Sequence, residues 1–171
     1  MFSFVFAHPT VQINTNKHVN PIKILFFIFS PPNSIITYNT LEELNGIVGF
    51  EATKLESTSL DKYEYDFGND KKITVSFSND KIVSIKSEYD KKELKNKKVT
   101  LDNLSDIKAR INDGISYDEF KKAVGGVDGT LIEVSSWNKY VWVAEDGSSN
   151  VTASFGKDGN LKFFNGLGFK N

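Results

Sequence analysis

The chain has 171 residues, no cysteine and a formal net charge of −1. Its hydrophobic fraction of 39% and charged fraction of 25% are typical of a folded, soluble chain of one or two domains and exclude a disordered or collagen-like one. The missing thiols exclude disulfides, zinc–thiolate sites, cysteine nucleophiles and a lipid-anchored cysteine, and no apolar run reaches the ~20 residues of a membrane-spanning helix.

The beginning of the chain differs in composition from the rest. Residues 1–41 hold all four prolines and both histidines but no acidic residue. Lys17 and Lys23 precede the apolar run 24–29, and a polar stretch with two prolines follows it, an order typical of a secretory signal. A buried strand with a loop, or a reading frame begun too early, fits the same residues. We interpret residues 1–34 as a leader-like segment, so the protein is secreted or on the cell surface if the leader is a signal, and cytoplasmic if it is not.

The rest of the chain contains an internal repeat. One constant spacing separates Leu55 from Ile132, Leu60 from Trp137, Tyr63 from Tyr140 and Tyr65 from Trp142. With small length changes, Thr37, Leu41 and Gly46 fall on Ser116, Phe120 and Gly125. Such a pattern indicates a tandem duplication. We predict a first unit over 35–89, a charged linker over 90–100 and a second unit over 101–171.

Each unit is predicted to contain a helix that packs on its strands. Ser116 with Glu119 three residues later forms a capping-box pattern, and Gly125 with Gly126 is a helix-stop signal. In the first unit we place the cap at Thr37 and the helix end at Gly46. A further amphipathic helix over 101–111 opens the second unit, and the first unit lacks its counterpart.

Antiparallel strands follow each helix. Residues 62–67 alternate between charged and aromatic side chains, and 73–77 alternate as well, which is the pattern of half-buried strands. The pairs Asn79-Asp80, Asp146-Gly147 and Asp158-Gly159 are suited to tight hairpin turns. The predicted fold class is α+β: two tandem units, each a helix and an antiparallel meander, join into one curved sheet with the helices on one face.

The residues of the second unit resemble a known family. The string from Gly114 to Gly126, the stretch from Tyr140 to Ser148, and the later Phe155 and Gly166-Leu167-Gly168 are similar to the beta-lactamase inhibitory protein family and its secreted relatives. Outer-membrane assembly lipoproteins of the SmpA/OmlA type share a single copy of the unit. The resemblance implies a concave sheet of two joined units. The founding inhibitor has a disulfide in each unit and a loop that enters its target's active site. This chain has no cysteine and no matching loop. The resemblance therefore implies the fold, but it is a poor basis for expecting inhibition of a beta-lactamase.

The residues point away from catalysis. No histidine follows His18, which excludes a histidine base, a Ser-His-Asp triad and histidine metal ligands from the two units. The carboxylates fall mostly in predicted turns or on outward strand positions. Bidentate recognition of phosphate relies on arginine, and Arg110 is the sole arginine in the sequence. We therefore expect no nucleic-acid partner. We predict no enzyme activity, no catalytic residue, no cofactor and no metal.

Aromatic residues are the candidate binding groups. A single-layer sheet with helices on one side cannot bury both faces, and tryptophan and tyrosine are favoured anchors of protein interfaces. The candidates for a protein-binding face are Trp137, Tyr140, Trp142, Phe163, Tyr63 and Tyr65. The opposite interpretation, that these side chains form the core, applies above all to Tyr63 and Tyr65. We predict an exported protein-binding module whose partner is an enzyme or an envelope component; the alternative is a structural envelope protein whose sheet only packs or dimerises.

Overall fold

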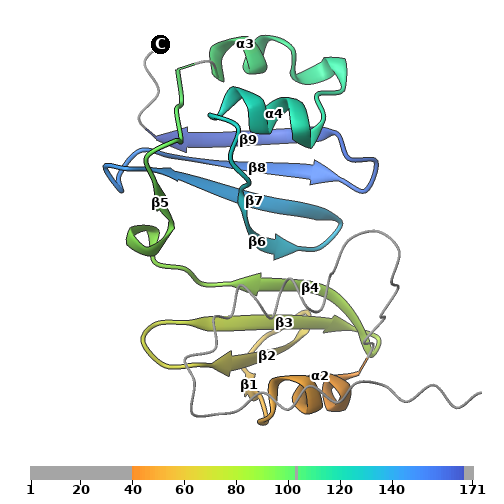
Figure 1. Ribbon diagram of the computed structural model, residues 1–171. Helices are drawn as coiled ribbons and strands as arrows, with labels where there is room; N and C mark the ends of the chain where they lie inside the picture. The colour runs from red at the N-terminus through yellow and green to blue at the C-terminus, as the bar shows by residue number, and fades with distance from the viewer. Residues whose placement is uncertain (1–39, 103, 168–171) are drawn as a thin grey trace, which may run out of the picture.

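The computed structural model describes residues 40–102 and 104–167, and the predicted leader 1–34 lies outside these ranges. The chain folds as an α+β protein with one large sheet (Figure 1). The helices are α2 (Leu41–Val48), α3 (Leu104–Ala109) and α4 (Tyr117–Ala123), with short 3-10 turns η1 (Lys91–Leu94) and η2 (Ile111–Asp113). The strands are β1 (Thr53–Leu55), β2 (Asp61–Asp66), β3 (Lys72–Ser78), β4 (Lys81–Ser87), β5 (Lys95–Asn96), β6 (Thr130–Val134), β7 (Trp137–Ala144), β8 (Asn150–Gly156) and β9 (Leu161–Leu167).

The sheet runs in the order β1-β2-β3-β4-β6-β7-β8-β9, and every neighbouring pair along this path is antiparallel. The short strand β5 lies off the path and pairs with β7 in parallel. The predicted turns are present: Asn79 and Asp80 have φ of 49° and 59°, and Gly147 and Gly159 have positive φ as well. These left-handed residues give the β-hairpins their tight reversals.

The helices α2 and α4 cover the same face of the sheet, which we call the helix face. Ile85 lies opposite Val134 across β4 and β6, and Val134 lies opposite Asn138 of β7. Opposed residues share a face and side chains alternate along a strand, so Trp142, four positions after Asn138, lies on the same side as Ile85. Ile85 packs in one core with Leu44 of α2, and Trp142 packs in another core with residues of α4.

Two separate clusters of buried side chains lie beneath the helices. One joins α2 to β2, β3 and β4, and its fully buried members include Leu44, Tyr65 and Ile85. The other joins α3 and α4 to β7, β8 and β9, with Phe120 and Trp142 at its centre. In Figure 1, α2 accordingly lies at the β1 end of the sheet, whereas α3 and α4 lie at the β9 end.

Helix α2 begins later than the sequence analysis expects. Thr40, not Thr37, is the N-cap of α2: its side chain accepts a hydrogen bond from the Glu43 amide, and the Glu43 carboxylate accepts one from the Thr40 amide. The helix continues through Gly46 and ends at Gly49, which has φ of 86°. The predicted end at Gly46 is therefore wrong, because the complete capping box at Thr40 shifts the start of the helix toward the C-terminus.

The helix of the second half is placed correctly. Ser116 is the N-cap of α4, and its hydroxyl accepts a hydrogen bond from the Glu119 amide. The predicted opening helix is shorter than 101–111: α3 covers only Leu104–Ala109, and η2 follows it. Leu104 and Ile107 are buried in the second core, as the apolar spacing predicts.

Candidate functional site

The candidate aromatic residues divide between the two faces of the sheet. Trp142 is 2% exposed, and its indole Nε1 donates a hydrogen bond to the Val127 carbonyl at 2.9 Å. Its ring lies 5.1 Å from the ring of Phe120 on α4. Gly129 makes room for the indole, since a Cβ there would stand 2.5 Å from Cζ2 of Trp142. The expected outward position of Trp142 is therefore wrong: this residue is part of the core under α4.

The three tyrosines among the candidates also lie on the helix face. Tyr65 is 1% exposed, and its hydroxyl donates to Asn45 Oδ1 at 2.7 Å. Burial raises the pKa of both Tyr65 and Tyr140. Tyr63 and Tyr140 are half-buried and pack in the two cores. Their placement on an outward binding face is corrected to a place in the cores, because β2 and β7 turn these alternate residues toward the helices.

Trp137 and Phe163 lie on the other side of the sheet, which we call the open face. Their side chains are 45% and 39% exposed, and their rings meet edge to face with centroids 5.1 Å apart. Trp137 lies opposite Gly156 of β8, and Phe163 lies opposite Ser154 of the same strand. These two small residues let the large rings approach one another across β8. We call this exposed contact the aromatic pair.

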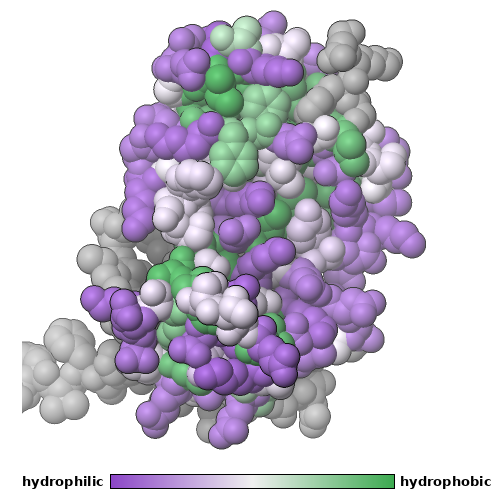
Figure 2. All heavy atoms as spheres, turned by 180° about the vertical axis from the view of Figure 1, so that it is seen from behind, coloured by the Kyte–Doolittle hydropathy of each residue, from purple (hydrophilic) through white to green (hydrophobic). Residues whose placement is uncertain are grey.

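Charged side chains share the open face with the aromatic pair. Lys139 lies two positions along β7 from Trp137 and pairs with Glu133 at 3.7 Å. Farther along the sheet, Lys72 pairs with Glu64 at 2.8 Å and with Asp66 at 3.5 Å. Figure 2 shows the molecule from behind the view of Figure 1, with hydrophilic side chains over much of the surface and a hydrophobic patch toward the α3 and α4 end.

Part of the open face is covered by the segment between the two halves. Val141 and Val143 of β7 are buried together with Ile132, and Tyr89 and Leu94 pack against them. The sequence analysis interprets 90–100 only as a charged linker. Its lysines at 92, 95, 97 and 98 are indeed exposed, but Leu94 is half-buried over β7. The apolar Leu94 within the lysine run is the signal from which this cover could have been found.

Several carboxylates in the turns have structural partners. Asp146 accepts hydrogen bonds from the Ser148 and Ser149 amides and from the Ser149 hydroxyl. These donors lower its pKa to about 2. Asp158 pairs with Lys162 at 2.7 Å, and Asp128 pairs with Lys121 at 2.6 Å. Within 40–102 and 104–167, no group of three or more His, Cys, Asp or Glu side chains is arranged to hold a metal ion.

Comparisons with known proteins give a likeness of fold. Neither the protein-family models nor the curated proteins include a match to the chain. Among solved structures, the fold is similar to that of a "putative beta-lactamase inhibitor protein" from Streptococcus mutans, with a TM-score of 0.52 and 15% sequence identity over 90% of this chain and 100% of the other. The part of the chain that the structure describes contains no helix with the length and apolarity needed to span a membrane. The fold-level likeness agrees with the resemblance drawn from the sequence.

Proposed function

We propose that the protein is a non-enzymatic, exported protein-binding module that docks its partner on the open face. The exposed aromatic pair, Trp137 with Phe163, is the observation that carries this proposal. Large aromatic rings are favoured anchors of protein interfaces, because they bury much apolar area with few rotatable bonds. The binding residues are thus Trp137 and Phe163, rather than the six aromatics of the sequence analysis.

The surroundings of the aromatic pair suit a protein partner. The ion pairs Lys139–Glu133 and Lys72–Glu64 lie on the same face and are partly exposed. Charges around an apolar centre mainly set specificity and the rate of association. The Streptococcus mutans protein of similar fold is named for inhibition, which is a binding function, and this name supports the proposal.

The proposal includes a duplicated architecture. Four positions of α2 and its end correspond to four positions of α4 and its end. They are Thr40, Leu44, Val48 and Gly49 for α2, and Ser116, Phe120, Val124 and Gly125, in the same order, for α4. Both sets contain a capping hydroxyl, two buried apolar residues and a glycine with positive φ. These correspondences support units over 35–89 and 101–171 with a linker over 90–100. A leader over 1–34 would direct export.

Affinity capture tests the proposed function. The wild-type chain, immobilised, is incubated with an envelope fraction from the cells that produce it, and retained proteins are compared with those retained by Trp137→Ala/Phe163→Ala. We expect the double variant to keep the wild-type circular dichroism spectrum and to lose the specific partner, because its substitutions remove exposed rings and no core contact.

Phe50→Ala is the matched control. Phe50 is another exposed aromatic, 36% exposed, but it packs against Tyr65 and Phe67 on the helix-face side. The Phe50→Ala variant should therefore retain the partner as the wild type does. Equal capture by the double variant and the wild type would refute the open face as the docking surface.

A structural envelope protein of the SmpA/OmlA type is the second candidate function. The aromatic pair that would anchor a partner is also suited to self-association. Sedimentation that depends on concentration in wild type but not in Trp137→Ala/Phe163→Ala, together with no captured partner, would favour this role. Addition of the chain to a purified beta-lactamase tests the resemblance directly, and we expect no inhibition, because the loop of the founding inhibitor has no match here.

A further inference from the structure

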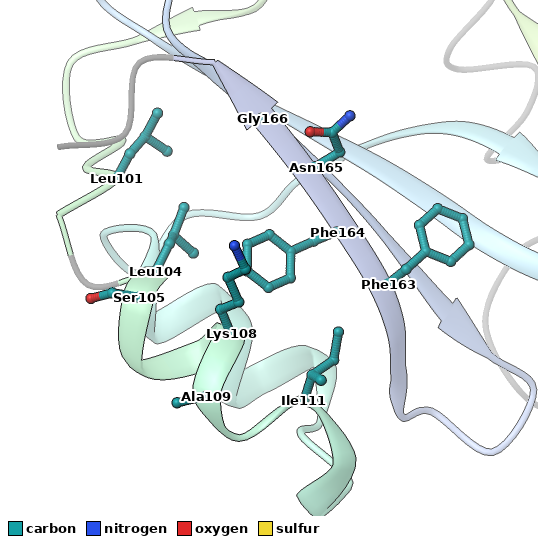
Figure 3. Close-up of a pocket in the computed structure, with 10 residues that line it drawn as sticks. All are labelled: Leu101, Leu104, Ser105, Lys108, Ala109, Ile111, Phe163, Phe164, Asn165 and Gly166. Atoms are coloured by element: carbon teal, nitrogen blue, oxygen red, sulfur yellow. The ribbon is translucent and has the colours of Figure 1, made fainter. Parts of the chain in front are cut away.

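A groove separates helix α3 from the last strand of the sheet (Figure 3). Its volume is about 810 Å³. One wall is formed by α3 and its flanks, with Leu104, Ser105 and Lys108 among the lining residues; the other wall is β9, from Phe163 to Gly166. In Figure 3, the Phe164 side chain points from β9 toward α3, whereas Phe163 points away from the helix.

The strand that lines this groove is the last in the strand order, and β8 is the one strand that pairs with it in the described sheet. At the start of its other edge, Leu161 donates its amide to the Ile115 carbonyl at 2.7 Å. Beyond Leu161, no strand of the described sheet pairs with this edge. β9 is 7 residues long and contains no proline. In an antiparallel strand, alternate residues direct their backbone N–H and C=O groups to opposite sides, so half of these groups in β9 face away from β8. An edge of this kind is a template for another strand.

Among the described residues that line the groove, Lys108 is the sole charged one, and none is Asp or Glu. In the part of the chain that the structure describes, Lys108 has no ion pair. Apart from Ser105 and Asn165, the other lining side chains are apolar or small, with Leu104 and Ile111 on the helix side. The groove thus offers an apolar surface, a cation and a row of backbone hydrogen-bonding groups.

From these features we infer that the groove binds an extended peptide segment of another protein, in which apolar residues alternate with acidic ones. The segment would add as a strand to β9, with its apolar side chains beneath α3 and a carboxylate against Lys108. Backbone pairing of this type supplies affinity, and the pockets for alternate side chains supply specificity. This site is separate from the open-face docking of the proposed function, although Phe163 belongs to both surroundings.

The position of α3 favours a single added strand over a second copy of this chain. In Figure 1, α3 lies at the β9 end of the sheet, beyond that strand. If two copies paired through their β9 strands, the two α3 helices would lie on the same face of the joined sheet, next to the paired strands. There the helices would compete for space. A lone peptide strand brings no such helix.

Nuclear magnetic resonance of the full chain tests the inference. The probe is a peptide as long as β9, 7 residues, in which valine alternates with glutamate. We expect saturable shifts of the β9 and α3 amides, and slower hydrogen exchange of the β9 amides that face the groove. A peptide of the same length with proline at alternate positions, which lacks the needed N–H donors, should not protect them.

Two variants locate the peptide. Lys108→Glu should weaken binding of the acidic peptide about tenfold, or about 1.4 kcal/mol, and favour a valine–lysine peptide, because it reverses the charge that faces the carboxylate. Ser105→Trp, at an exposed position of α3, should fill the groove and abolish binding. Lys122→Glu on α4 is the control for charge reversal, because Lys122 is exposed and lies outside the groove.

The results separate this inference from the proposed function. Trp137→Ala should leave peptide binding unchanged while weakening the open-face partner. The inference is overturned by absence of β9 protection at millimolar peptide, by equal binding to Lys108→Glu, or by shifts centred on Trp137 instead of β9.

Discussion

At the residue scale, the two tryptophans have opposite environments. Trp142 is buried and hydrogen-bonded to Val127, whereas Trp137 is 45% exposed. We predict that Trp142→Ala lowers the free energy of unfolding by about 3–5 kcal/mol, because it leaves a large cavity under α4. Trp137→Ala should change it by about 0.5 kcal/mol or less. Urea denaturation measures both, and a loss at Trp137 as large as that at Trp142 would contradict the assigned faces.

The acid sensitivity of one turn provides a second residue-scale test. The Ser149 hydroxyl, followed by the Ser149 and Ser148 amides, lowers the pKa of Asp146 to about 2. Because the pKa in the folded chain is below the ordinary value of about 3.9, the stability from these hydrogen bonds is present above that value and is lost as the pH falls toward 2. We predict that Ser149→Ala raises the Asp146 pKa in a carboxyl NMR titration. An unchanged midpoint would show that the hydroxyl does not stabilise the carboxylate.

At the element scale, the end of α4 depends on a glycine. Gly125 has φ of 102°, and a Cβ there would overlap the carbonyl oxygen of Lys98, where the linker passes the helix. Thr100 donates its amide to the Val124 carbonyl at the same place. Gly126 also has positive φ, but nothing would meet its Cβ within 4 Å.

We therefore predict that Gly125→Ala destabilises the protein by more than about 2 kcal/mol, since a backbone clash adds to the cost of the left-handed conformation. Gly126→Ala should cost about 1–2 kcal/mol, from the conformation alone. Thermal unfolding of the two variants compares them directly. Equal losses of stability in the two variants would mean that the contact between Lys98 and the end of α4 does not restrict position 125.

Sequence patterns predicted many of the elements. The alternation of apolar and polar residues predicted β2 and β3, and the residue pairs at 79–80, 146–147 and 158–159 predicted the hairpin turns. The cap of α4 was correct as well. The start of α2 was missed because Thr37 and Thr40 are both capping residues, and the choice depends on which register buries Leu44 and Val48 against the strands. That packing is tertiary and is not contained in the local pattern.

The sheet faces on which the candidate aromatic residues lie could be predicted only in part. Alternation already places Trp137 on the opposite side of β7 from Tyr140 and Trp142, so these three could not share one face. Which side the helices cover depends on contacts such as the packing of Trp142 against α4 and its hydrogen bond to Val127. Those contacts are long-range. The groove beside β9 could not be predicted from the sequence either, because its existence depends on where α3 lies relative to the edge of the sheet.

At the scale of the whole molecule, the sheet is continuous but its cores are separate. The halves join where Ile85 meets Val134 and Lys86 meets Glu133, a much shorter pairing than that of β7 with β8. We predict that Leu44→Ala accelerates amide exchange chiefly in β2, β3 and β4, and that Phe120→Ala does so chiefly in β7, β8 and β9. Hydrogen exchange by mass spectrometry resolves the strands. If each variant accelerated exchange across the whole sheet, the halves would form one cooperative unit.

The open face as a protein-docking surface is tested most directly by the affinity for the captured partner. Calorimetry would compare the dissociation constants of wild type, Trp137→Ala/Phe163→Ala and Phe50→Ala. Since anchor residues contribute about 2 kcal/mol or more, we predict that the double variant binds at least about thirtyfold more weakly, while Phe50→Ala binds like wild type. Wild-type affinity in the double variant would contradict the assignment of the open face.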